Sequence, residues 1–181
     1  MRLLRPLVLL AVAVGAVVWL RSDRAYRPDS LAWRAVDRDL ASRFPDLPST
    51  TTAALADRLD APDPPLLLDA RTEAEFAVSH LPGARHVDPD AEAGALAAAL
   101  ADVDPEREIV VYCSVGVRSA TVTARLREAG FAHVENLRGS IFEWANEGRP
   151  VVRDGREVEA VHPYDAVWGR LLVPERRADL P

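Results

Sequence analysis

The sequence predicts an α/β fold in which a mostly parallel central sheet is flanked by helices on both faces, with an apolar helix at the N-terminus. Three observations lead to this prediction. From residue 66 onward, short apolar runs alternate with amphipathic stretches, an order typical of parallel strands joined by helices. A hydrophobic fraction of 49% in 181 residues is ample for a core. Polar side chains directly follow two of the apolar runs, at the sheet edge where ligands bind in such folds.

Residues 1–22 are predicted to be a hydrophobic membrane anchor or signal segment. Arg2 and Arg5 precede an unbroken apolar run over residues 6–20, and with Arg5 snorkelling residues 3–20 can span a lipid bilayer. A cleaved signal peptide and a helix packed on the domain are the alternatives. We expect a membrane-anchored protein with a single span and an extracytoplasmic domain, although arginines flank the run on both sides and leave the side of the membrane open.

Residues 23–48 are predicted to be an amphipathic helical linker. Ser30 can cap a helix over residues 30–44, and Pro45 ends it. One face of this helix carries Trp33, Val36, Leu40 and Phe44. We expect that face to pack on the following domain; binding of a protein partner, of unknown identity, is the alternative.

The main domain is predicted over residues 49–152, after a hinge at residues 48–52. A first helix begins at Thr51 or Thr52, and the proline-rich residues 61–65 form a turn. Strands are expected at residues 66–69, 86–87, 109–112 and 134–136. Helices are expected at residues 72–78, through Leu96 and Leu100, at 119–129 and at 140–147.

A C-terminal extension over residues 153–181 is charged and contains prolines. We expect it to fold back on the domain through the stretch around His162, Pro163, Tyr164 and Trp168, to which the sequence assigns no chemistry.

The only cysteine of the chain, Cys113, lies between the strand at residues 109–112 and a predicted helix. A thiol at a helix N-terminus lies among unpaired backbone N–H groups and near the positive end of the helix dipole. Its pKa can fall from about 8.5 to roughly 3.5–7.5, so that it is ionised at neutral pH. Gly116 lets the loop curl with its amides inward, and Arg118 adds a positive charge. A cysteine that only fills the core needs neither feature, so we interpret Cys113 as a nucleophile.

This loop resembles the active-site loop of rhodanese-type sulfurtransferases, and three further stretches resemble the same family in the same order. Leu67–Arg71 is similar to its strand ending in Asp-x-Arg, and Ser79–Ala84 to its His-Ile-Pro-Gly-Ala turn. Asn136–Trp144 is similar to its closing Leu-x-Gly-Gly-x-x-x-Trp element, with Ser140 in place of the second glycine. The resemblance covers residues 50–152 and implies a single rhodanese-like domain.

The resemblance implies a double displacement. The Cys113 thiolate attacks the outer sulfur of a small donor such as thiosulfate, sulfite leaves, and a cyanide or thiol acceptor takes the sulfur from the Cys113 persulfide. The implied substrate-binding residues are those of the loop, Ser114, Val115, Gly116, Val117, Arg118 and Ser119, whose amides stabilise the charge on sulfur. Arg118 either holds the loop or attracts an anionic donor. No metal or organic cofactor is implied. The two-domain thiosulfate enzymes carry basic residues where this chain has Ser114 and Val115, which leaves the natural donor open.

Three further residues of the similar stretches, Asp69, Arg71 and His80, are interpreted as structural support of the site; acid–base partners of the cysteine are the alternative. Two other functions compete with sulfur transfer. Cysteine phosphatases resemble each other in a Cys-x5-Arg loop, whereas the spacing here is Cys113-x4-Arg118. A non-catalytic rhodanese-like binding module at the membrane is the second.

Composition excludes several classes of site. A formal net charge of −6, without a basic patch interleaved with aromatic residues, argues against a nucleic-acid partner. A single cysteine excludes an internal disulfide and a cysteine-rich metal site, and the 4 histidines are too scattered in the sequence to suggest a metal site.

Overall fold

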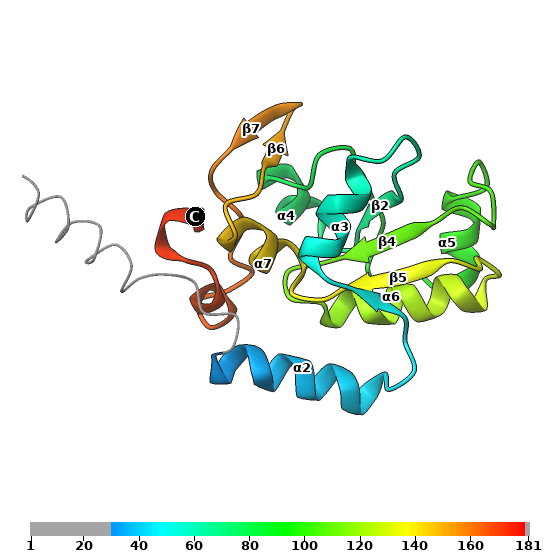
Figure 1. Cartoon of the computed structure of the whole chain (residues 1–181), viewed down its shortest axis with the longest axis horizontal. Coiled ribbons are helices and arrows are strands. Elements are labelled where there is room, and N and C mark those ends of the chain that lie inside the picture. The colour runs from blue at the N-terminus through cyan, green and yellow to red at the C-terminus, as the bar shows by residue number, and fades with distance from the viewer. Residues whose placement is uncertain (1–29, 180–181) are drawn as a thin grey trace, which may run out of the picture.

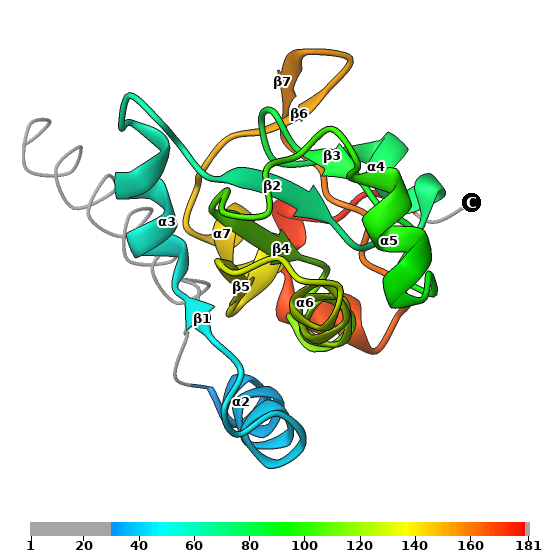
Figure 2. The same cartoon turned by 90° about the vertical axis from the view of Figure 1, so that its right-hand side faces the viewer.

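The computed structural model describes residues 30–179, which form a five-stranded parallel sheet covered by helices on both faces (Figure 1 and Figure 2). The strand order is β1-β5-β4-β2-β3, and every neighbouring pair is parallel. The strands are β1 (Ser49–Thr50), β2 (Leu66–Asp69), β3 (Arg85–His86), β4 (Ile109–Tyr112) and β5 (Val134–Leu137). The predicted parallel sheet with flanking helices is confirmed.

Apolar residues on both faces of the central strands explain why helices cover both sides. All four residues of β4 are buried, as expected for a central strand of a parallel sheet. Leu67 and Val110 belong to one apolar cluster, with α3 and α7. Leu68 and Val111 belong to a second cluster on the other face, with α5 and α6. The α-helices are α2 (Leu31–Arg43), α3 (Thr52–Leu59), α4 (Glu73–Val78), α5 (Ala93–Ala99), α6 (Val117–Glu128) and α7 (Ser140–Asn146).

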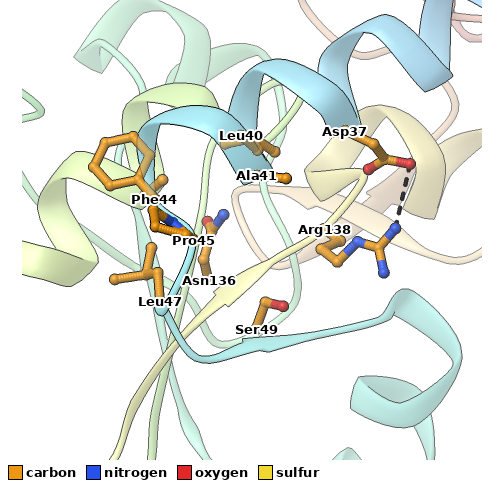
Figure 3. A pocket seen from close by; sticks show the side chains of 10 residues that line it. Asp37, Leu40, Ala41, Phe44, Pro45, Leu47, Ser49, Asn136 and Arg138 are labelled. Atoms are coloured by element: carbon orange, nitrogen blue, oxygen red, sulfur yellow. Dashed lines mark ion pairs between the residues drawn. The ribbon is translucent and has the colours of Figure 1, made fainter.

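Helix α2 confirms the predicted amphipathic helix and packs on the domain beside α6 (Figure 2). The Ser30 hydroxyl accepts a hydrogen bond from the Trp33 amide at 3.4 Å and so caps the helix. The predicted apolar face is turned to the domain core, where Trp33, Val36 and Leu40 are buried. Between α2 and the β1–β5 edge of the sheet lies a groove, shown in Figure 3, beside which Asp37 pairs with Arg138 at 3.2 Å.

Three local expectations need correction. The hinge expected at residues 48–52 contains the edge strand β1, because its backbone pairs with β5. Helix α6 begins at Val117 rather than at Ser119, since Gly116 adopts a φ of +109° and forms the N-cap. No strand was expected after residue 136, yet residues 151–158 form an antiparallel hairpin of β6 (Val151–Arg153) and β7 (Arg156–Val158).

The membrane localisation predicted from the sequence is wrong on the evidence of the described residues. Among residues 30–179 no helix is both long and apolar enough to cross a bilayer. The longest of them, α2, has 13 residues and only one buried face, and at 1.5 Å per residue it reaches about 20 Å of the ~30 Å hydrocarbon core. The predicted span at residues 3–20, with the apolar N-terminal helix of the predicted fold, lies outside the described residues. We therefore assign neither a bilayer partner nor an extracytoplasmic side.

The C-terminal extension folds back on the domain, as expected. Val161 and Leu172 are buried in the same apolar cluster as α7. The stretch between them carries the short 3₁₀-helix η1 (Trp168–Leu171), and a second one, η2 (Pro174–Arg176), follows. The segment, drawn from orange to red in Figure 1, thereby returns to the end of the sheet that carries Cys113.

Candidate active site

Cys113 lies at the carboxyl end of the central strand β4, where its backbone is attached to the start of α7. Its amide donates a hydrogen bond to the Ser140 hydroxyl at 3.1 Å, and that hydroxyl donates to the Leu137 carbonyl at 3.0 Å. The amides of Ile141 and Phe142 donate to the carbonyls of Cys113 and Ser114. Ser140 therefore connects the ends of β4 and β5, and it does so at a φ of +50°, a conformation that a non-glycine residue rarely adopts.

The loop after Cys113 curls around the sulfur atom. The Gly116 amide donates to Cys113 Sγ at 3.2 Å, and the Ser119 hydroxyl lies 3.5 Å from the same atom. The Ser119 hydroxyl donates its one proton to Asn136 Oδ1 at 2.6 Å, while the Asn136 amide group donates to the Gly116 carbonyl at 3.1 Å. Asn136, the next-to-last residue of β5, thus holds Gly116 and Ser119, the two residues that contact the sulfur.

These contacts favour the ionised form of the thiol. Burial alone would raise the pKa of Cys113, which is 1% exposed. The positive charge of Arg118 and the hydrogen bonds from Ser119 and Gly116 outweigh burial, so that the pKa of Cys113 lies below its ordinary value. The direction of this shift is the one expected from the sequence, and the role of Cys113 as a nucleophile stays a prediction.

Arg118 reaches a buried carboxylate rather than open solvent. Its guanidinium donates to both oxygens of Glu75, at 2.7 and 2.8 Å, and to the Ser114 hydroxyl at 2.9 Å. The Ser114 hydroxyl itself donates to Glu75 at 3.0 Å. Burial alone would raise the pKa of Glu75, but the bonds from Arg118 and from the Thr72 amide and hydroxyl lower it to about 2. The bidentate pair joins the loop to the start of α4.

Asp69 ends the neighbouring strand β2, Arg71 lies between β2 and α4, and His80 follows α4. The hydrogen bonds of these three side chains go to groups other than Cys113. Asp69 and Arg71 are both fully buried and pair at 2.7 Å, and Arg71 also donates to the Ser79 carbonyl at 2.5 Å. The His80 ring stacks on Phe76 at 3.9 Å between centroids. This arrangement favours the interpretation as structural support, which stays a prediction.

A small cavity of about 130 Å³ opens beside the cysteine. It is lined by Cys113, Ser114, Val115, Val117, Arg118, Tyr164 and Trp168. The predicted loop residues Gly116 and Ser119 contact the sulfur but do not line the cavity. Within residues 30–179, no three His, Cys, Asp or Glu side chains are grouped so that they could hold a metal ion.

Comparison with known proteins agrees with this geometry. The family model described as the rhodanese-like domain matches residues 51–147, more than half of the chain. The chain belongs to the rhodanese-like family.

Two curated relatives of this rhodanese-like chain carry sulfurtransferase names. A "Sulfurtransferase" of Allochromatium vinosum is 35% identical over 103 residues, which are 55% of this chain and 89% of the relative. The "Putative sulfurtransferase YtwF" of Bacillus subtilis is 30% identical over 105 residues, 58% of this chain and 97% of the relative. The crystal structure of a rhodanese-like domain protein from Staphylococcus aureus is 27% identical with a TM-score of 0.52, and the match covers 60% of this chain and 99% of that one. Sulfur transfer in general is therefore the chemistry that the relatives support.

Four residues of this rhodanese-like site were not singled out as site residues from the sequence. Glu75 carried the signal of a helix start, since Thr72 and Glu75 form a capping box, and Asn136 stood in a stretch that resembles the family. Tyr164 and Trp168 belong to the extension, beyond the matched residues 51–147, and nothing in their sequence neighbourhood indicated the cysteine.

Proposed function

We propose that this rhodanese-like domain transfers a sulfane sulfur from a small donor, such as thiosulfate or a persulfide, to a thiol or cyanide acceptor through a persulfide on Cys113. The observation that carries the proposal is the position of Cys113 Sγ. It lies at the carboxyl end of β4, accepts a hydrogen bond from the Gly116 amide and borders a small cavity. The sulfurtransferase names of the relatives support this class of reaction.

The first displacement forms a bond between Cys113 Sγ and the outer sulfur of the donor. In thiosulfate the S–S bond breaks and sulfite leaves with the electron pair, so that the total charge stays the same. The second displacement reverses the roles: cyanide or a thiolate attacks the outer sulfur, the Cys113 S–S bond breaks, and the cysteine thiolate is regenerated. No oxidant or reductant is consumed, because one sulfur atom is passed between nucleophiles.

The loop from Ser114 to Ser119 stabilises the charged sulfur in both displacement steps. Negative charge lies first on Cys113 Sγ and then on the outer sulfur of the persulfide, a bond length farther into the cavity. Backbone N–H groups fixed in advance stabilise such a charge without reorganising. We assign this function to the loop from Ser114 to Ser119, and the ionisation of the thiol to Arg118 through its charge.

Arg118 bears on the phosphatase alternative. In a phosphate-encircling loop the arginine must face the anion, whereas the guanidinium here donates to both oxygens of Glu75. Together with the shorter Cys113–Arg118 spacing in the sequence, this pairing disfavours a phosphoryl substrate.

Mass spectrometry of the full-length protein after incubation with thiosulfate or an alkyl persulfide tests the proposal. We expect a gain of one sulfur atom on Cys113, its release on adding cyanide or a thiol, and no gain in the matched variant Cys113→Ser. Absence of any sulfur on the parent protein with every donor would contradict the proposal and leave a non-catalytic rhodanese-like binding module.

A further inference from the structure

We propose that Tyr164 and Trp168 of the C-terminal extension determine the donor specificity of the Cys113 cavity. They favour a small persulfide whose sulfane sulfur is carried by an apolar group, and they disfavour the hydrated thiosulfate dianion. This inference rests on the proposed function and adds the class of donor to it.

The turn that carries Tyr164 and Trp168 has a specific backbone conformation that hydrogen bonds hold in place. Tyr164 has a φ of +66°, a conformation that costs an aromatic residue free energy and persists only where the surroundings impose it. The Tyr164 amide donates to His162 Nδ1 at 3.0 Å. Asp165 Oδ1 accepts from the amides of Val167 and Trp168, both at 2.8 Å, and thereby starts the helical turn that presents Trp168.

The turn is attached to the domain on both sides. Val161 before it and Leu172 after it are buried in the apolar core. The Asn146 side chain, at the end of α7, donates to the Leu171 carbonyl at 2.7 Å and accepts from the Val173 amide at 2.8 Å. Because α7 also contacts the backbone of Cys113, the same helix positions the turn and the nucleophile.

The walls of the cavity offer an anion few polar side chains. Val115, Val117, Tyr164 and Trp168 present apolar surface to it, and Arg118 is the only cationic residue among the described residues that line it. The Arg118 guanidinium donates to Glu75 and Ser114, and its Cζ atom lies 4.9 Å from the centroid of the Tyr164 ring. One face of the guanidinium is therefore against an aromatic ring, and its charge is balanced by a carboxylate.

These features distinguish thiosulfate from an alkyl persulfide by the charge and the hydration of each donor. Thiosulfate carries two negative charges, and it would have to leave water for a cavity of about 130 Å³ whose cation is already paired. An alkyl persulfide carries at most one charge, and its alkyl group can contact the aromatic and valine side chains. The Tyr164 and Trp168 side chains thus lower the free-energy cost of binding for the alkyl persulfide but not for thiosulfate.

The reaction with the alkyl persulfide R–S–SH balances. Cys113 Sγ forms a bond to the outer sulfur, the donor S–S bond breaks, and the alkyl thiolate R–S⁻ leaves with the electron pair. The proton stays on the transferred sulfur or passes to solvent, and no further reactant is needed.

The test compares rate constants for the gain of sulfur on Cys113 from ethyl persulfide and from thiosulfate in the full chain. In the parent we expect a higher kcat/KM with ethyl persulfide. Tyr164→Ala and Trp168→Ala are each expected to lower the ratio of the two kcat/KM values about tenfold, the order expected when a cation–π contact or an apolar contact is lost. Tyr164→Phe keeps the ring and is expected to keep the ratio of the parent. Val167→Ala is the matched control, because Val167 is on the same turn, is 68% exposed and does not line the cavity.

The possible outcomes distinguish this inference from the function on which it rests. If the parent gains sulfur from neither donor, the proposed function fails and this inference fails with it. If the parent gains sulfur but the two alanine variants keep its donor ratio, or if Val167→Ala changes that ratio as much as they do, the sulfurtransferase function stands and the role of the aromatic pair is refuted.

Discussion

Among single residues, Cys113 has a lowered pKa because of the groups around it rather than because it is exposed. A thiol that is 1% exposed would ordinarily hold its proton more tightly. The contacts around Cys113 reverse that tendency, and the charge of Arg118 is the largest single cause that lowers the pKa of the thiol. Arg118 lowers the pKa of Cys113 even though it is paired with Glu75, because its positive charge acts directly on the nearby sulfur.

Replacement of Arg118 by methionine is expected to raise the pKa of Cys113. The positive charge favours the thiolate, so its removal favours the thiol, and the unpaired Glu75 carboxylate acts in the same direction. The pH profile of Cys113 alkylation by iodoacetamide should therefore move to higher pH. Arg125→Met is a suitable control, since Arg125 lies on the same helix but donates to the Pro89 and Ala91 carbonyls. An unchanged profile in Arg118→Met would mean that the amides alone ionise the thiol.

At the scale of elements, the Glu75 carboxylate connects α4 to the start of α6. It completes the capping box with Thr72 at the N-terminus of α4 and accepts both bonds from Arg118 at the start of α6. Glu75 also accepts a hydrogen bond from the Ser114 hydroxyl, so one buried carboxylate stabilises a helix end and the loop after Cys113 together.

This double role predicts a pH-dependent contribution to stability. The pKa of Glu75 falls from 4.5 to about 2 on folding, so the folded state binds the proton more weakly than the unfolded state. The stabilisation is therefore present above about pH 4.5 and is lost as the pH falls toward 2. Urea unfolding at pH 5 and pH 3 should show a smaller loss of stability on acidification for Glu75→Gln than for the parent. Glu73→Gln, an exposed neighbour in the same helical turn, should behave like the parent; equal losses in all three proteins would contradict the assignment.

For the whole molecule, the C-terminal extension is part of the folded unit, although it lies beyond the matched family residues 51–147. Its two buried side chains, Val161 and Leu172, share the apolar cluster that lies between the sheet and α7. The backbone of Val161 also pairs with that of Arg177. The extension therefore adds to the core as well as to the cavity beside Cys113.

Truncation after Val158 is expected to lower the free energy of unfolding by about 3–6 kcal/mol, because full burial of each of two aliphatic side chains contributes roughly 1.5–3 kcal/mol. Chemical denaturation followed by tryptophan fluorescence or circular dichroism measures the change. Truncation after Ala178 retains Val161, Leu172 and the pairing with Arg177, so it should cost little. Equal free energies of unfolding of the two truncated proteins would contradict this prediction. They would show that the extension adds nothing to the stability of the domain.

Much of the fold and part of the candidate site could be predicted from local sequence. Strands β2 and β4 were predicted with the bounds observed, because a short apolar run between turn residues carries its own signal. The loop from Cys113 to Ser119 was predictable for the same reason, since the thiol, the glycine and the helix start are adjacent in sequence. The resemblance to rhodanese-type enzymes rested on such local stretches.

Only the tertiary structure decided what those local groups contact. Glu75 and Arg118 are 43 positions apart. The local sequence of an acidic residue at a helix start does not show whether it also forms an ion pair with a distant residue. Strand β1 has two residues, too few to show a period, and forms because β5 offers it a partner. The aromatic wall beside Cys113 depends on where the chain returns after Val161, which is set by burial in a core built from distant segments.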